Sequence, residues 1–261
     1  MEPAPTDTPA EGPPEGSPAR ADAPLPNVEA AATAGPRALR TAAFRVAIAL
    51  CRSRLASTAS GRFASVVAVA VAAGAFAIAL ALRVTDGPAA PVGGLLRKAA
   101  MVIAWVSGSF LATAAAKDAT AMDRLDGVEA LVAARGVGPS LLRAARTLGA
   151  TAQITRTLGV PVALFALGTA FFAGDVTMAT RRLLAAALLL MWGVVAGVTL
   201  STLAGLSARM FGARGPSALF AIVIGERIVA GWAGLPAWSV PGALEAVLAL
   251  ALRVSGVGGG H

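Results

Sequence analysis

Four uncharged apolar stretches divide the chain, and each approaches or exceeds the ~18 to 20 residues that an α-helix needs to cross a bilayer. They cover residues 63–82, 99–116, 157–174 and 183–208. The Phe, Val, Ile and Leu residues of the first stretch favour its insertion by roughly 3 to 5 kcal/mol. The pattern predicts an integral membrane protein of the all-α class, a polytopic bundle of transmembrane helices.

The C-terminal third is interrupted by charge. Glu226 and Arg227 follow an apolar run that is too short to span. At the bilayer centre each would cost about 2.5 to 3.5 kcal/mol, so both must be paired, interfacial or facing a cavity. Two interpretations of Glu226 and Arg227 stay open: a charged pair at the mouth of a pore, or a solvated turn.

We expect a fifth helix over 216–233, a bend through Leu235-Pro236 and Val240-Pro241, and a last helix over 242–254. This gives about six spans. Because Glu245 weakens the last helix as a span, five spans followed by an interfacial segment is the alternative.

Two different regions precede the first span. Residues 1–29 hold eight prolines and six acids against one arginine, a composition typical of a disordered tail. Residues 30–62 hold six arginines and no acid. Their apolar positions Leu39, Ala43, Val46 and Leu50 share one helical face, which indicates either an interfacial helix or a positive anchor that sets topology. The transmembrane domain is expected over 63–256.

The distribution of basic residues predicts a cytoplasmic N-terminus. Seven Lys and Arg residues precede the first span and six lie in 117–156, whereas each other loop holds two or three. The loop after the third span, for example, is expected to hold Arg181 and Arg182. The positive-inside rule places both rich segments in the cytoplasm. The net charge of +8 therefore reports topology, and no nucleic-acid partner is expected because aromatic residues are not interleaved with the basic ones.

The segment 117–156 is patterned as helix, turn and helix. Ala121, Leu125, Val128 and Val132 form one stripe, which predicts an amphipathic helix over 117–135. Residues 136–140 end it, and Pro139 suits the first turn of a second helix that leads into the third span.

This segment resembles the cytoplasmic loop of type-2 permeases of ATP-binding-cassette exporters. The resemblance rests on Asp123-Arg124, Gly127, the Leu- and Ala-rich run to Arg135, and Pro139-Ser140-Leu141-Leu142. Val128 stands where Thr is usual, and Gly136-Val137-Gly138 is an insertion before the proline. The similarity extends over most of 36–235.

The resemblance implies that helix 117–135 docks in a groove of a separate nucleotide-binding ATPase subunit. The coupling positions would be Asp123, Arg124, Gly127, Glu129 and Arg135. It also implies a second permease subunit, so that the transporter is a homodimer or a heterodimer. The transporter would lie in a bacterial inner membrane and contact the membrane lipids. A helix that lies on the membrane surface with solvated charges is the alternative interpretation of this segment.

Several classes are disfavoured by the residues available. Neither lysine lies in the Gly-Lys-Ser/Thr context of a P-loop, so any ATP must be bound by a partner subunit, and we expect no cofactor in this chain. His261 is the single histidine, which argues against a membrane metalloenzyme. Residues 126–130 weakly resemble a phosphatidyl-alcohol transferase motif, but Leu131 replaces its arginine. Cys51 is the single cysteine and cannot form an internal disulfide, so we expect it to have a structural role rather than a redox role.

We therefore expect a non-enzymatic transport subunit, driven through its cytoplasmic segment by an external ATPase. The alternative is a non-catalytic membrane scaffold that recruits a partner through its Pro-rich tail or its central helix. A haem-exporter-type permease of similar size lacks supporting His or aromatic signals. Apolar spans rich in Ala carry no information on the transported substrate.

Overall fold

The computed structural model describes residues 36–86, 92–118, 138–234 and 239–257 of the 261-residue chain. The chain divides into two units, residues 1–39 and 40–261, and α2 (Pro36–Ser57) begins in the first. Among the described residues every regular element is a helix and none is a strand. The predicted all-α class is therefore confirmed for this part of the chain.

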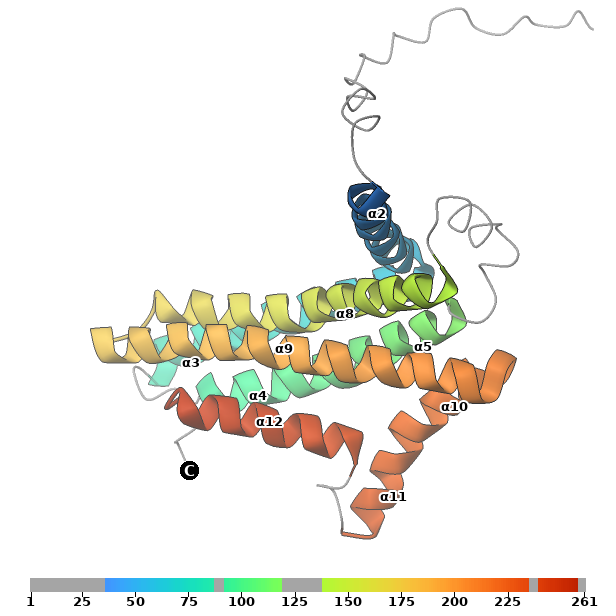
Figure 1. Cartoon of the computed structure of the whole chain (residues 1–261). Helices are drawn as coiled ribbons and strands as arrows, with labels where there is room; N and C mark the ends of the chain where they lie inside the picture. The colour runs from blue at the N-terminus through green and yellow to red at the C-terminus, as the bar shows by residue number, and fades with distance from the viewer. Residues whose placement is uncertain (1–35, 87–91, 119–137, 235–238, 258–261) are drawn as a thin grey trace, which may run out of the picture. The chain divides into compact units, whose positions relative to one another are not determined.

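The second unit continues from α2 through a series of helices (Figure 1). Their bounds are α3 Ala59–Asp86, α4 Val92–Ile103, the π-helical turn η2 Ala104–Gly108, α5 Ser109–Lys117, α8 Pro139–Ala170, α9 Val176–Phe211, the 3₁₀ turn η4 Gly212–Arg214, α10 Gly215–Phe220, the π-helical turn η5 Ala221–Gly225, α11 Glu226–Trp232 and α12 Val240–Val254.

Four stretches among the described residues are helical, long enough and apolar enough to cross a membrane. They are Ala59–Thr85, Val92–Lys117, Pro139–Ala170 and Val176–Gly225. Each contains all or most of one apolar stretch identified in the sequence. The structure thus confirms four helices that are long and apolar enough to cross a membrane where the sequence predicted them, and the total of six spans stays a prediction.

The third span begins as predicted and ends earlier. Pro139 lies in the first turn of α8 after an extended Gly138, where its missing N–H costs nothing. The helix ends at Ala170 rather than near residue 174. A short turn follows, and Asp175 then caps α9 by accepting a hydrogen bond from the Met178 amide at 2.6 Å, which fixes the start of the next helix.

Arg181 and Arg182 were expected in the loop between the third and fourth spans, and that expectation is wrong. Both lie inside α9, which starts at Val176. Arg182 is buried, and its guanidinium donates to the Thr169 carbonyl near the end of α8. The same carbonyl accepts from the Phe172 amide at 3.2 Å, so the guanidinium adds a second hydrogen bond at the end of α8.

Helices α8 and α9 lie side by side and make the most extensive contact in the unit (Figure 1). Glycine permits this approach, because a Cβ added at Gly193 would lie 2.6 Å from the Gly159 Cα. One turn later, a Cβ at Gly197 would meet Thr155. Close packing through small residues three and four apart is a usual source of helix association in membranes.

The second span contains a π-helical turn at Ala104–Gly108, which widens the helix where it faces α3. Ser107 within this turn is fully buried, and its hydroxyl donates to the Ala64 carbonyl at 2.8 Å. Satisfying a polar side chain in the interior stabilises one register between the two helices.

The C-terminal third leaves α9 at Gly212, whose φ of +53° is a conformation that favours glycine. Gly215 then packs α10 against Ala208 of α9. Helical structure continues to Trp232, which agrees with the predicted fifth helix.

The last helix starts earlier than expected. Pro241 was assigned to a bend, but it lies in the first turn of α12, where proline is favoured. Ser239 caps this turn by accepting a hydrogen bond from the Gly242 amide at 3.0 Å. Trp192 then fixes α12 against α9, because its indole Nε1 donates to the Leu244 carbonyl at 2.9 Å.

Candidate functional site

The five predicted coupling residues fall on the part of the chain that the structure does not describe. Asp123, Arg124, Gly127, Glu129 and Arg135 all lie within residues 119–137, the central segment. The structure does describe the residues at which this segment starts and ends. Asp118 follows α5, and Gly138 precedes α8. The described part of the candidate site is therefore the geometry at these two ends.

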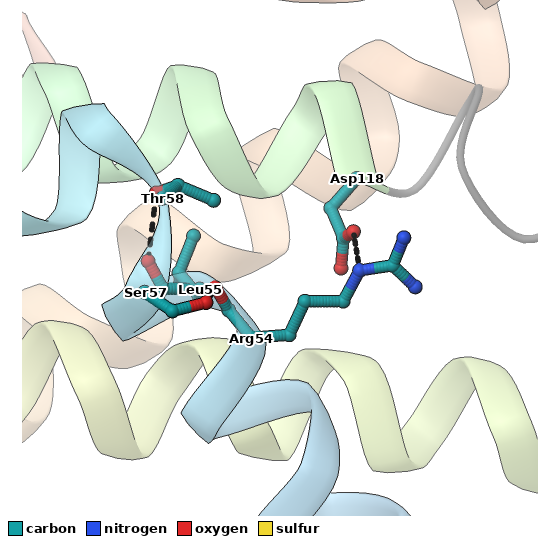
Figure 2. Close-up of polar contacts among 5 residues, drawn as sticks. All are labelled: Arg54, Leu55, Ser57, Thr58 and Asp118. Carbon is teal, nitrogen blue, oxygen red and sulfur yellow. Dashed lines mark hydrogen bonds and ion pairs between the residues drawn. The ribbon is translucent and has the colours of Figure 1, made fainter. Parts of the chain in front are cut away.

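Helix α2 turns into α3 at Thr58 through a set of local hydrogen bonds (Figure 2). The Thr58 hydroxyl donates to the Leu55 carbonyl at 2.8 Å and accepts from the Gly61 amide at 2.9 Å. Thr58 is thus the N-cap of α3. The Ser57 hydroxyl donates to the Arg54 carbonyl at 2.8 Å. These bonds fix the direction in which the last turn of α2 approaches the bundle.

From this turn Arg54 reaches the beginning of the central segment. Its Nε lies 3.3 Å from the Oδ1 of Asp118, as Figure 2 shows. The two side chains are 28% and 18% exposed, so this ion pair is better shielded from water than a pair on an open surface. The pair joins α2 to the point at which the chain leaves α5.

Cys51 and Arg146 complete this corner from α2 and α8. Together with Leu55, Ala115, Asp118 and Ala150 they line one small cavity. Burial raises the pKa of the Cys51 thiol, the negative charge of Asp118 raises the pKa further, and Arg146 and Arg54 oppose both effects. The thiol therefore stays protonated at neutral pH. Gly149 lets α8 approach, since a Cβ added there would lie 2.9 Å from the Cys51 Cβ.

A basic groove of about 490 Å³ lies between the start of α8 and the end of α9. Its lining contains three arginines, three hydroxyl side chains and no acid: Ser140, Arg143, Arg146, Thr147, Thr202, Gly205, Leu206, Ala208 and Arg209. Guanidinium and hydroxyl groups together suit carboxylate or phosphate groups. The groove lies on the first turns of α8, directly after the central segment.

Glu226, one of the two residues predicted at a pore mouth, has a structural contact. Its Oε1 accepts a hydrogen bond from the Val240 amide at 3.3 Å, which ties α11 to the first residue of α12. Its Oε2 is buried and has no hydrogen-bond partner among the described residues. The side chain of Arg227 lies outside the described residues, so the pairing of these two charges stays a prediction.

Sequence reasoning missed the ion pair between Arg54 and Asp118. Arg54 was counted only among the basic residues before the first span and Asp118 was not singled out, because no sequence pattern relates two positions so far apart. The described residues include no group of three or more His, Cys, Asp and Glu side chains that would hold a metal ion. At the described corner, residues of α2, α5 and α8 and Asp118 lie together.

No protein-family model, curated protein or solved structure matches this chain.

Proposed function

We propose that this chain is the membrane-spanning permease subunit of an ATP-driven exporter, coupled through its segment 117–156 to a separate ATPase subunit. The observation that supports this most directly is the ion pair between Arg54 and Asp118. It joins the Arg-rich helix α2 to the first residue after α5, where the central segment begins. A segment that transmits force needs such a fixed base, whereas a surface helix does not.

The other end of the segment is equally suited to carrying a displacement. Residue 138 leads directly into α8, a helix of 32 residues with a proline in its first turn. Close packing at Gly159 and Gly193 couples α8 to α9. A push on 119–137 would therefore move α8 and α9 together, as packed helices transmit strain with little loss.

The proposed topology has six spans with the N-terminus in the cytoplasm. The fourth span is then α9 alone, and the remainder of the stretch Val176–Gly225 belongs to the fifth. The fifth is the helical run from Gly215 to Trp232, about 27 Å long at 1.5 Å per residue. The sixth is α12. In this arrangement α2 lies at the membrane interface, consistent with Val46 and Leu50, which are 50% and 59% exposed on the face that the sequence predicted to contact lipid.

The remaining parts of the proposal follow from the same resemblance. ATP is bound by the partner ATPase, and a second permease subunit completes the transporter in a bacterial inner membrane. Asp123, Arg124, Gly127, Glu129 and Arg135 are the proposed docking positions, while Glu226 and Arg227 are proposed at the pore mouth. The basic groove at Arg143 and Arg209 suits acidic groups on the docked ATPase.

The proposal is tested by purifying the tagged full chain from its native cells in a mild detergent. We expect a stoichiometric ATPase subunit, identified by mass spectrometry, and ATP hydrolysis in the purified sample. Exchanging the two charges in the variant D123R/R124D keeps the net charge but should abolish recovery of that subunit. Arg253, an exposed residue in the last turn of α12, provides the matched control R253E, which should retain it.

Two results would contradict the proposal. One is purification without any ATPase, and the other is equal recovery from the D123R/R124D variant and the control. Both would favour the scaffold alternative, in which the tail or the central helix recruits a partner that does not hydrolyse ATP.

A further inference from the structure

A groove with a volume of about 620 Å³ lies between α3 and α8. Its lining comes almost entirely from these two helices: Ala56, Ser65, Val69, Ala72, Ala73, Phe76, Gln153, Arg156, Thr157, Val160, Pro161, Leu164, Phe165 and Gly168. Val69 and Leu164 are more than half exposed, so the groove opens on the outer surface of the helices. It is separate from the corner around Arg54 and from the basic groove.

The groove changes from polar to apolar along its length. Ser65, Gln153 and Arg156 come from the earlier parts of α3 and α8, and Phe76 and Gly168 come from later parts. Because Phe76 contacts Gly168, the two helices run in the same direction here. One end therefore presents hydroxyl, amide and guanidinium groups, while the other presents aliphatic and aromatic side chains.

The side-chain amide of Gln153, at the polar end of the groove, is buried and only partly hydrogen-bonded. Gln153 is only 4% exposed. Its Nε2 lies 3.5 Å from the Thr157 hydroxyl, and its Oε1 has no hydrogen-bond partner among the residues that the structure describes. A buried amide oxygen without a partner is uncommon in proteins, and an unseen ligand is one of its ordinary explanations.

A second acceptor lies beside it. Pro161 has no N–H, so the carbonyl of Thr157 receives no helical hydrogen bond from that position. Thr157 and Pro161 both line the groove. In a membrane, such a carbonyl is tolerated where another group supplies the donor. The polar end of the groove thus needs hydrogen-bond donors.

Arg156 adds a positive charge at the same end. It is exposed, it lines the groove, and among the described residues it has no ion-pair partner. An occupant must therefore combine a negative charge, a hydrogen-bond donor and an apolar chain.

We propose that this groove binds one anionic phospholipid whose headgroup carries hydroxyl donors. The phosphate lies at Arg156, a headgroup hydroxyl donates to Gln153 Oε1, and one acyl chain follows Val69, Leu164 and Phe76. From Ser65 to Phe76 the groove follows eleven residues of α3, about 17 Å at 1.5 Å per residue. This matches the ~15 Å half-thickness of the hydrocarbon core that one acyl chain occupies. The site is independent of the proposed transport function.

The test uses the full chain reconstituted in phosphatidylcholine vesicles that contain a small fraction of phosphatidylglycerol with a photoreactive acyl chain. Phosphatidylglycerol supplies both the phosphate and the glycerol hydroxyls. After illumination, we expect labelled peptides from 69–76 and 160–168. A photoreactive phosphatidylcholine measured in parallel separates headgroup recognition from general contact with lipid.

Three variants make the result specific. A73W fills the groove from its exposed rim and should abolish the labelling of both peptides, whereas A70W, at a position that is also exposed but lies outside the lining, should leave it unchanged. R156Q should reduce the preference for phosphatidylglycerol about fivefold, the factor that one basic side chain contributes near an anionic lipid. Q153L removes the acceptor of the headgroup hydroxyl, so it should also reduce the preference for phosphatidylglycerol. It should lower the labelling of 160–168 less than A73W does, because the apolar part of the groove stays open.

Labelling that does not favour these peptides over the other exposed faces would overturn the proposal. So would equal labelling of the A73W and A70W variants. Because Arg156 is exposed and its replacement does not threaten folding, an unchanged headgroup preference in R156Q would also overturn it.

Discussion

The guanidinium of Arg97 lies 2.8 Å from Oε1 of Glu245, and this ion pair joins α4 to α12 across 148 residues of sequence. This ion pair explains how the apolar helix α12 accommodates Glu245, the residue that was expected to weaken it as a span. The two side chains are 52% and 26% exposed, so the pair lies near the surface of the bundle. It fixes the last helix to the beginning of the second span.

The first prediction concerns this pair. R97Q and E245Q should each lower the melting temperature of the detergent-purified chain, and the double variant should lower it by less than the sum. Because both side chains are partly in solvent, the coupling energy should be only about 0.5 to 1 kcal/mol. Melting followed by intrinsic tryptophan fluorescence measures it. Strictly additive losses would show that the pair contributes no stability.

The second prediction concerns the contact between α8 and α9. A side chain at Gly193 must displace the backbone of Gly159, so G193L should destabilise the chain by about 1 to 3 kcal/mol, the usual cost of overpacking. Gly74 provides the control, since a Cβ there meets nothing within 4 Å. G74L should therefore melt close to the unsubstituted chain. Similar losses in both variants would mean that the close approach is not what Gly193 provides.

Much of the fold could be predicted because it depends on local patterns. Apolar stretches reveal membrane-spanning helices by length alone, and Pro139 marks the start of α8 because proline fits a first helical turn. The prediction for Pro241 was wrong, because a proline after an apolar run was taken as a bend although this one lies in the first turn of α12. The sequence does not distinguish a proline that ends one helix from one that starts the next.

The contacts that define the candidate sites could not be predicted. Arg54 and Asp118 meet only because α2 and α5 pack at one corner, and the packing depends on the whole bundle. The unpartnered oxygen of Gln153 likewise appears only when the side chain is seen buried. The coupling positions around Asp123 rest on resemblance and lie outside the described residues.

The third prediction concerns the pKa of Cys51, the single cysteine of the chain. Its labelling rate with a maleimide should rise with a midpoint above the ordinary ~8.5 of a free thiol, because burial and Asp118 both raise the pKa. D118N should lower the midpoint, and R146Q should raise it further, since Arg146 acts in the opposite direction. Shifts of the same sign in both variants would contradict this assignment of charges.

The raised pKa also has a consequence for stability. The thiol is protonated in both the folded and the unfolded chain below about pH 8.5. Above that pH the unfolded chain loses its proton first, so stability should fall as the pH rises through the pKa of the folded thiol. Melting temperatures measured from pH 7 to pH 10 should show this loss, and C51S should remove that part of it.

The last prediction concerns Thr58, whose hydroxyl caps α3 and also bonds the last turn of α2. T58A should cost about 1 kcal/mol, as the loss of an N-cap does, whereas T58S keeps the hydroxyl and should melt near the unsubstituted chain. Because the same turn directs Arg54 toward Asp118, T58A should also expose Cys51 and speed its labelling at fixed pH. If T58A lowers the melting temperature but leaves Cys51 labelling at the rate of T58S, the cap stabilises α3 without positioning the corner around Arg54.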